Sequence, residues 1–402
     1  MDRRSFLAAA GVAAVGAGVG TSTLQRGFRT IGVPRDADSI QAGVDAASPG
    51  DLVLVDAGTY DENVVVSTPG VTLRGVDRNA VVLDGDFDPG NGVDVAADGV
   101  AVENLTVRRF QGTGVYWHGV AGFRGSYLTA YNNGYYGIYA TGSSDGRFEY
   151  SYASGHPDAG FYLGRHRPYD ATVANVVAEH NAVGYSGTST GGRLTVRDSI
   201  FRHNRTGVLP NTLDTTDPPQ RASRFVGNVV SENDDEDAPA LRYVAPTFGM
   251  GVVLWGASDN VVADNRVDGH PNFGIVADHN VVAPSGNEVR NNVVRGSGEA
   301  DLALGAPAGE GNRFAGNQFA TSAPSGLRAD ASDGSRRVAA VFERQAVAQG
   351  DPAPGGDWRD QPEPDPKPTM RDPGAPPRIA DRATSWGDDG ENGDGEPGGG
   401  TE

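Results

Sequence analysis

The sequence has no cysteine and a single lysine, Lys367, among its 402 residues. The absence of cysteine excludes disulfide bonds, thiolate catalysis, metal sites with cysteine ligands and a lipid-modified N-terminal cysteine. Basic residues number 33 against 52 acidic ones, so the formal net charge is −19. Such a chain lacks the basic face that nucleic-acid phosphates require, and we expect no nucleic-acid partner. The acidic, arginine-rich composition is typical of a high-salt habitat, although a biased genome would favour arginine equally.

The sequence also lacks a long hydrophobic run. At the N-terminus, "MDRRSFLAAAGVAAVGAGVG" places Arg3 and Arg4 before Ser-Phe-Leu and a short Ala/Val/Gly stretch. This order resembles a twin-arginine export signal, and the stretch is too short and too glycine-rich for a spanning helix. We therefore expect residues 1–27 to direct export, and the protein to act outside the cell or at its surface. We expect no membrane contact beyond a signal that stays uncleaved.

The C-terminal part, residues 331–402, has little that could form a core. A helix is expected at 336–348, from "RRVAAVFERQAVA", and it would cap the folded part. The acidic, proline- and glycine-rich residues 350–402 cannot bury an apolar core, so we expect them to be disordered.

What the sequence has in abundance is glycine, and part of it is periodic. Equivalent glycines are separated by 22, 23, 23, 24, 23, 44 and 23 residues. They are Gly92, Gly114, Gly137, Gly160, Gly184, Gly207, Gly251 and Gly274. We interpret them as tight bends that need a left-handed backbone.

Each repeat glycine is followed by an alternating strand. The residues one and three positions after it are mostly apolar and should face inward, and the residue between them should face outward. A second strand precedes each glycine, as in "SYLTAY" and "RFEYSY". Short β-rich segments every 23 residues or so predict a solenoid. The fold class expected over residues 28–330 is all-β, a single-stranded parallel β-helix.

The beginning of this region resembles a known family. Residues 30–85 look like the opening of pectate-lyase-like right-handed β-helix proteins, and the later Asn-x-x-Gly-(Ile/Val) coils resemble those of carbohydrate-binding and sugar-hydrolase β-helices. The matching motifs are Ser-Ile-Gln-Ala-Gly-Val-Asp-Ala-Ala (39–47), Pro-Gly-Asp (49–51), Gly-Thr-Tyr (58–60) and Leu-Arg-Gly (73–75). The resemblance implies right-handed coils with a short N-terminal capping helix. It implies no single activity, because this fold hosts lyases, hydrolases, esterases, epimerases and non-enzymatic proteins.

Histidines and asparagines recur four residues before the repeat glycines. The column is Asn133, His156, His180, His203 and His270, with Asn233 in the displaced coil. One interpretation is a hydrogen-bonded ladder along the stack. The other is a copper or zinc site at His156, His180 and His203, since the resemblance extends to β-helix proteins that service copper. No cluster of cysteine or methionine supports the metal site.

Tyrosines occupy the outward position in three successive coils. Tyr116, Tyr139 and Tyr162 would form an aromatic strip on one outer face, and such strips offer sugars a flat apolar surface. The alternative is that exposed tyrosines merely favour strands.

Three segments depart from the repeat, and loops that leave a solenoid are where binding and catalysis usually occur. They are "RHRPYD" (165–170), "PNTLDTTDPPQR" (210–221) and "DDEDAPALRYVAPTFGM" (234–250), the last two inside the 44-residue interval. We expect them to overhang neighbouring coils and form a groove. The candidate residues there are Tyr162, Arg165, His166, Arg167, Asp170, Asn211, Asp214, Asp217 and Arg221.

The groove could act on a uronic acid by abstracting its C5 proton. That reaction needs a neutralised carboxylate, a base and an acid on the leaving oxygen. The candidates are Arg165, Arg167 or Arg221 for the carboxylate, His166 or His156 for the base, and Tyr162 for the acid. Calcium held by Asp214 and Asp217 is the alternative neutraliser. The Asp-Pro-His-Asp motif of mannuronan epimerases is replaced here by His-Pro-Asp, and the paired aspartates of polygalacturonases are not recognisable.

The sequence thus predicts an exported, monomeric β-helix protein that binds, and cleaves or epimerises, an extracellular and acidic polysaccharide. The alternatives are a non-catalytic surface or structural β-helix and a copper-handling accessory protein.

Overall fold

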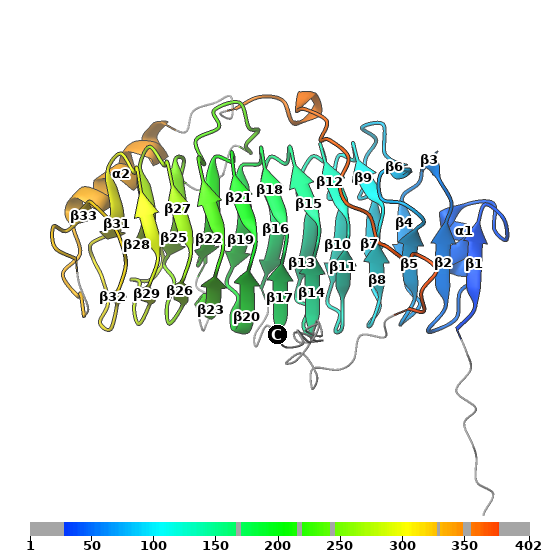
Figure 1. Ribbon diagram of the computed structural model, residues 1–402, viewed down its shortest axis with the longest axis horizontal. Coiled ribbons are helices and arrows are strands. Elements are labelled where there is room, and N and C mark those ends of the chain that lie inside the picture. The colour runs from blue at the N-terminus through cyan, green and yellow to red at the C-terminus, as the bar shows by residue number, and fades with distance from the viewer. Residues whose placement is uncertain are drawn as a thin grey trace, which may run out of the picture.

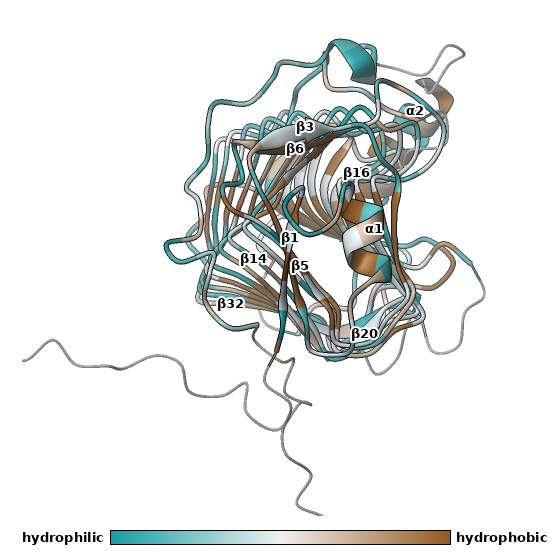
Figure 2. Cartoon of the chain, turned by 90° about the vertical axis from the view of Figure 1, so that its right-hand side faces the viewer, coloured by the Kyte–Doolittle hydropathy of each residue, from teal (hydrophilic) through white to brown (hydrophobic). Residues whose placement is uncertain are grey.

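The computed structural model describes residues 28–165, 170–214, 219–241, 246–327, 330–348 and 355–377. The chain winds as an all-β, right-handed parallel solenoid of about 12 coils. Figure 1 shows the strands in one row from β1 (Thr30–Val33) to β32 (Arg313–Ala315), and Figure 2 shows the coils in projection from the N-terminal end. The predicted fold class is therefore confirmed. The expected signal, residues 1–27, lies outside the described residues.

Three parallel sheets form the sides of the solenoid. Sheet A contains β1, β2 (Leu52–Val55), β5 (Thr72–Gly75), β8 (Ala101–Glu103), β11 (Arg124–Ser126), β14 (Gly146–Glu149), β17 (Ala171–Ala174), β20 (Gly191–Arg197), β23 (Arg221–Val226), β26 (Val261–Ala263), β29 (Glu288–Arg290) and β32. Sheet B contains β3 (Gly58–Tyr60), β6 (Val81–Asp84), β9 (Thr106–Arg108), β12 (Thr129–Tyr131), β15 (Tyr152–Ser154), β18 (Val177–Glu179), β21 (Ile200–Arg202), β24 (Val229–Ser231), β27 (Arg266–Asp268) and β30 (Val293–Arg295). Sheet C contains β4 (Val64–Val66), β7 (Val93–Val95), β10 (Val115–His118), β13 (Ile138–Thr141), β16 (Ala159–Gly164), β19 (Val183–Thr188), β22 (Thr206–Asn211), β25 (Met250–Trp255), β28 (Phe273–Asp278), β31 (Ala300–Leu304) and β33 (Ser322–Ala323).

The core is a continuous column inside the coils. Val115, Ile138 and Phe161 are successive register partners in sheet C, and all three are fully buried. The residues two positions further along each strand, such as Trp117 and Leu163, are buried as well. The predicted alternation therefore places the correct side chains inside. One coil fills the 44-residue interval, because Thr206 pairs with Met250 directly.

The repeat glycines are required for a reason other than the expected one. None of them has a positive φ. A Cβ on Gly137 would lie 2.6 Å from the carbonyl oxygen of Gly160, and one on Gly207 would lie 2.6 Å from that of Gly251. The coils approach so closely here that no side chain fits between them. Left-handed residues occupy other corners, where Asn175 (φ 55°) and Asp264 (φ 58°) are examples.

A polar ladder runs through the turns between sheets B and C. Its fully buried members are Asn133, His156, Asn181, Asn204, Asn233 and His270. The Oδ1 atom of Asn204 accepts hydrogen bonds from the backbone and side-chain nitrogens of Asn181 at 3.1 and 2.9 Å. The ladder thus satisfies polar groups that the coil interior would otherwise leave without partners.

His180 and His203 are not members of this ladder, contrary to the alignment on glycines. The turn between β15 and β16 comprises residues 155–158, whereas the turn between β18 and β19 comprises only 180–182. In the shorter turns, the position four residues before the glycine is therefore one residue before the ladder member, which is Asn181 or Asn204. His180 (φ 59°) and His203 (φ 51°) lie there with left-handed backbones and point toward solvent.

Two helices cover parts of the solenoid. α1 (Ile40–Asp45) lies against the first coils, and the Ser39 hydroxyl accepts a hydrogen bond from the Ala42 amide at its start. α2 (Arg336–Ala348) lies where a helix was expected, but along the outer face of sheet C. It packs Val338, Val341 and Phe342 into an apolar cluster on that face. Within the ranges given above, no helix has the length and hydropathy needed to cross a bilayer.

Residues 355–377 form a C-terminal strap across the outer face of sheet B, whereas the composition predicted disorder for residues 350–402. The strap includes a short 3₁₀ helix, η1 (Trp358–Asp360), and runs back toward the N-terminal coils (Figure 1). None of its residues is buried. Residues 350–354 and 378–402 lie outside the described residues.

The strap is held by side chains of the coils that donate hydrogen bonds to its oxygen atoms. Asn132 donates to the carbonyl of Gln361 at 2.8 Å, and Arg78 donates to that of Pro368 at 3.0 Å. The ammonium group of Lys367 lies 3.9 Å from the ring centre of Tyr152. Composition could not predict this order, because the strap's partners are supplied by distant coils rather than by its own apolar residues.

Candidate functional site

A column of tyrosines lies on the outer face of sheet C. Tyr116, Tyr139 and Tyr162 are register partners, with ring centroids 4.8 and 4.7 Å apart and planes inclined by 13° and 5°. Because the rings stack face to face, both faces of Tyr139 are covered by its neighbours. The predicted column exists, but it is not the flat exposed strip that was expected, and only the outer faces of its end rings are left for other contacts.

Beyond Tyr162 the column continues with smaller side chains, and a pocket opens there. Ser186 is the register partner of Tyr162, and Leu209 is the partner of Ser186. The pocket has a volume of about 380 Å³. It is lined by Tyr136, Tyr139, Asp158, Tyr162, Arg165, Val183, Ser186, Thr188, Leu209, Asn211, Leu213, Pro246 and Trp255. This mixture of aromatic walls and a few polar groups is typical of small-ligand sites.

Asp158 supplies a pocket group that titrates near neutral pH. Burial raises the pKa of its carboxyl group to about 7, although a hydrogen bond from the Tyr136 hydroxyl acts in the opposite direction. Burial also raises the pKa of Tyr139 to about 12, and it raises the pKa values of Tyr136 and Tyr162 further. The tyrosines therefore stay protonated at neutral pH, while Asp158 can gain or lose a proton there.

Arg165 and Asn211 are two further polar residues of the pocket. Arg165 forms an ion pair with Asp214 (Nη1–Oδ2 3.3 Å), and both side chains are largely exposed at the rim. Asn211 is 2% exposed, and its Nδ2 donates to the Leu209 carbonyl at 3.0 Å. Its Oδ1 has no hydrogen-bond partner within the described part of the chain. A ligand hydroxyl group is the natural donor for this buried oxygen.

The pocket gathers only some of the residues that the sequence suggested. Tyr139, Tyr162, Arg165 and Asn211 line it, and Asp214 reaches it through Arg165. Tyr116 lies at the other end of the ring column and does not line the pocket. His166, Arg167 and Asp217 lie outside the described residues.

Three candidate residues are placed elsewhere. Asp170 pairs with Arg193 at 2.7 Å at the start of β17, and Arg221 begins β23 in sheet A; neither lines the pocket. His156 cannot act as the base, because it is buried in the ladder. Its Nδ1 donates to Asn181 Oδ1 (2.8 Å), its Nε2 accepts from Asn133 (3.3 Å), and burial lowers its pKa to about 4.

The suggested metal site has no matching geometry. His156 is enclosed by the ladder, while the rings of His180 and His203 stack on the surface with centroids 6.0 Å apart. Within the residues that the structure describes, no group of three or more His, Asp or Glu side chains could hold a metal ion. The Nδ1 atom of His180 instead lies 2.7 Å from Asp235 Oδ2, and the Nε2 atom of His203 lies 3.6 Å from Glu232 Oε2.

The repeat pattern did not point to Asp158, Tyr136 or Trp255, although all three line the pocket. Asp158 is the last residue of the longer turn between β15 and β16, and that extra residue was the available signal. Trp255 is the last residue of β25, directly after the inward-facing Leu254, and the repeat pattern gives no signal for it.

The loop behind the pocket is anchored by His180, and we expect this anchor to depend on pH. In the loop that follows β24, the Asp235 carboxylate accepts hydrogen bonds from the backbone amides of Asp237 and Ala238. The same loop contacts the turn that carries Asp158, because the Leu241 amide donates to the Pro157 carbonyl (2.7 Å). The hydrogen bond to Asp235 raises the pKa of His180, although burial opposes this. Glu179 also raises it and Arg202 lowers it.

The stabilisation should therefore be complete below the unfolded-state pKa of about 6.5 and should be lost as the pH rises through the higher folded-state value. Because the His180 side chain is 35% exposed, we expect a difference of about 0.5–1 kcal/mol. Urea unfolding of wild type and His180→Gln at pH 5.5 and pH 9 measures this difference. The free energies of unfolding of the two proteins should become equal at pH 9. A difference that is the same at both pH values would contradict the assignment.

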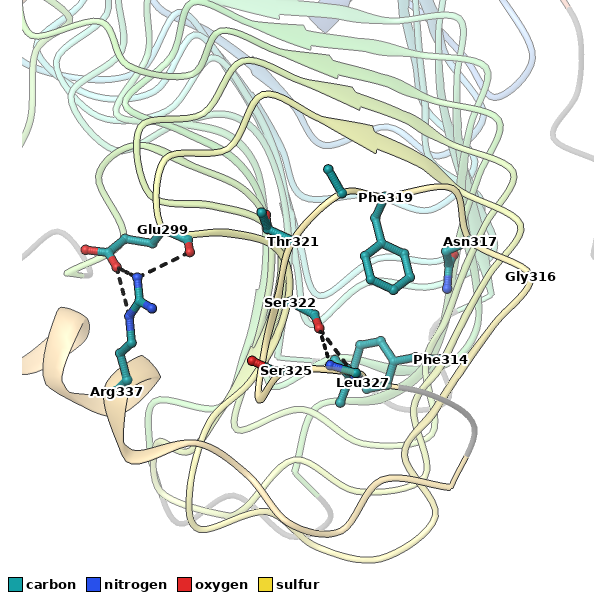
Figure 3. Close-up of a pocket in the computed structure, with 12 residues that line it drawn as sticks. Glu299, Phe314, Gly316, Asn317, Phe319, Thr321, Ser322, Ser325, Leu327 and Arg337 are labelled. Atoms are coloured by element: carbon teal, nitrogen blue, oxygen red, sulfur yellow. Dashed lines mark hydrogen bonds and ion pairs between the residues drawn. The ribbon is translucent and has the colours of Figure 1, made fainter.

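A second hollow, of about 700 Å³, lies at the C-terminal end of the solenoid (Figure 3). Its floor includes Phe314 and Leu327, which are nearly buried, and Phe319, which is 38% exposed. At its rim, Glu299 is already paired with Arg337 at 2.7 Å. This hollow is the open end of the last coils. The tyrosine pocket is the stronger candidate, because it contains a carboxyl group, Asp158, that titrates near neutral pH.

Comparisons with known proteins address the fold. Residues 64–217 match a sequence family described as "Right handed beta helix region". The chain has a right-handed β-helix repeat. No curated protein sequence matches the chain significantly.

Solved structures with a similar fold share little sequence with this β-helix. ORF18 of Geobacillus virus E2 is 12% identical, with a TM-score of 0.51 over 72% of this chain and 63% of the viral chain. The A-module of mannuronan C-5 epimerase AlgE4 from Azotobacter vinelandii is 16% identical, with a TM-score of 0.46 over 69% of this chain and 90% of that module. An alginate lyase from Paenibacillus sp. is 17% identical, with a TM-score of 0.43 over 73% and 99% of the two chains. At these identities the comparisons show the fold alone.

Proposed function

We propose that the protein binds a polysaccharide outside the cell, and that a sugar unit occupies the pocket beside Tyr162. The observation that carries this proposal is the end of the tyrosine column, where a ring face meets Asp158, Asn211 and Arg165 in one pocket. An apolar ring face bordered by polar groups matches a sugar, which has C–H bonds on its faces and hydroxyl groups around its rim. The export that this role requires is proposed from the twin-arginine sequence at Arg3 and Arg4.

We further propose that Asp158 transfers a proton in this pocket. A pKa near 7 lets the same carboxyl group accept and release protons at neutral pH, as general acid–base catalysis requires. On a uronate unit, ionised Asp158 would accept the C5 proton while Arg165 faces the sugar carboxylate. Elimination then forms the C4–C5 double bond and breaks the C4–O4 bond, and a protonated tyrosine hydroxyl gives its proton to the leaving oxygen.

The proposal is tested with full-length protein and a panel of soluble pectate, alginate and neutral glucans in high salt. Binding is measured by affinity electrophoresis, and elimination by the ultraviolet absorbance of unsaturated uronates. We expect binding of at least one polysaccharide, and turnover that rises with pH as Asp158 ionises near pH 7. Asp158→Asn should reduce turnover by about 100-fold or more.

Asp264→Asn is the matched control, because Asp264 lies at a corner between sheets A and B, and asparagine suits its left-handed backbone. The turnover of Asp264→Asn should stay within about two-fold of wild type. Failure of wild type to bind any member of the panel would refute the proposed function. Binding without turnover, unchanged in Asp158→Asn, would restrict it to a binding protein.

A further inference from the structure

The pocket lies where a fourth ring of the tyrosine column would be. The ring centroids are spaced 4.8 and 4.7 Å apart, which is the distance between neighbouring coils. The next position in the column belongs to Ser186, whose short side chain cannot continue the stack. The column therefore leaves a gap one rung deep, with the ring of Tyr162 on one side.

The opposite side of the gap is closed. Leu209 follows Ser186 in the column, and Trp255 stands beside it, backed by Phe342 of α2 (centroids 6.3 Å apart). From there onward α2 covers sheet C, because Val253 and Val276 belong to the apolar cluster that it buries. An extended chain cannot continue along this face, so the pocket is a blind end.

The polar groups suit a ring inserted at this depth. Within the described residues the buried Asn211 Oδ1 atom has no hydrogen-bond partner, so it can accept a hydrogen bond from a ligand hydroxyl group, while Nδ2 donates one of its two hydrogens to the Leu209 carbonyl. Asp158 lines the same pocket and carries the carboxyl group that changes charge near neutral pH. A pyranose meets these requirements with one apolar face on Tyr162 and its hydroxyl groups toward Asn211 and Asp158.

Resting on the proposed function, we propose that the pocket recognises the end of a polysaccharide chain, with one terminal pyranose ring inserted as the fourth member of the tyrosine stack. The protein then binds chain ends and not chain interiors. A volume of about 380 Å³, at the lower end of the range for ligand pockets, agrees with one ring rather than a bound stretch of polymer.

The first test counts binding sites on a polysaccharide that the full-length protein binds. Partial hydrolysis that halves the mean chain length, at constant mass, should double the number of protein molecules bound at saturation. The constituent monosaccharide should compete for binding. An unchanged number of sites, or competition only by oligosaccharides of several rings, would overturn the recognition of a single terminal ring.

The second test fills the gap. Ser186→Tyr should extend the stack into the pocket and weaken binding by about 100-fold or more, with a melting temperature close to that of wild type. Asp94→Tyr is the matched control, since Asp94 is the register partner of Tyr116 and extends the column at its other end. It should leave binding within about two-fold of wild type.

The outcomes separate this inference from the proposed function. Undiminished binding by Ser186→Tyr, with wild type also binding, would overturn the inserted ring and leave polysaccharide binding in place. If Ser186→Tyr does not fold, the site count and the monosaccharide competition on wild type still decide. If wild type binds no carbohydrate, the proposed function fails, and this inference fails with it.

Discussion

Replacing Glu103 by glutamine should lower the free energy of unfolding by about 3–5 kcal/mol, because it leaves two buried guanidinium groups without their shared carboxylate. Glu103 is 1% exposed on the outer face of sheet A. Its carboxylate pairs with Arg74 at 2.8 Å and with Arg124 at 3.0 Å. Arg124 also contacts Glu149, and Arg147 ends the chain of alternating charges. Urea unfolding of wild type and Glu103→Gln measures the difference.

Glu288→Gln provides the matched control, because Glu288 also lies in sheet A and is also paired with an arginine, Arg290, at 3.2 Å. Its side chain is 46% exposed, so this substitution should change the free energy of unfolding by less than about 1 kcal/mol. If the two substitutions have equal effects, burial does not control the strength of the network, and the account of sheet A is wrong.

Replacing Asn204 by alanine should lower the free energy of unfolding by at least about 3 kcal/mol. The substitution removes bonds from Asn204 Nδ2 to the carbonyls of Ala178 and Arg202, both 3.0 Å, and the acceptor for the amide of Asn181. Each buried polar group left without a partner costs about 1–3 kcal/mol. Thermal and urea unfolding should both report the loss, and hydrogen exchange should locate it in the turns between sheets B and C.

Asn63→Ala is the comparison for the ladder. Asn63 is exposed and donates one hydrogen bond, to the Asn91 carbonyl at 2.6 Å. Its loss should change the free energy of unfolding by about 0.5 kcal/mol or less. A similarly small effect of Asn204→Ala would mean that the ladder does not hold neighbouring coils together.

The fold could be predicted because its determinants repeat in the sequence. The alternation around Val115, Ile138 and Phe161 fixes which side chains enter the core, and the spacing of the glycines fixes the length of a coil. These signals are local and recur, so each coil supports the interpretation of the next. The physical reason for the glycines was nevertheless misjudged, since it depends on the distance between two coils and not on the torsion angle within one.

The candidate site was harder to predict, because it depends on irregularities. One additional residue in the turn before β16 moves His156 into the ladder and places Asp158 in the pocket, whereas the shorter turns move His180 to the surface. The pocket itself arises from a small residue, Ser186, at a position where three coils have tyrosine. The far wall of the pocket includes Trp255. Its ring stacks on that of Phe342 in α2, which lies 87 residues further along the chain.

The order of the C-terminal strap also follows from tertiary context. The strap has the composition of a disordered segment and buries none of its residues, yet arginine and asparagine side chains of the coils hold its carbonyl groups. The strap covers part of the outer face of sheet B, where Glu363 accepts a hydrogen bond from the Tyr131 hydroxyl group, whereas the tyrosine column lies on sheet C.

The central claim, that the pocket beyond Tyr162 binds a sugar ring, is tested most directly by crystallography. Crystals of the full-length protein are soaked with a short oligosaccharide of a polysaccharide that it binds. We predict electron density for one terminal ring stacked on Tyr162, with a hydroxyl group within hydrogen-bond distance of Asn211 Oδ1 and another near Asp158. An ordered sugar on sheet B or in the hollow around Phe319, with the pocket empty, would contradict the account.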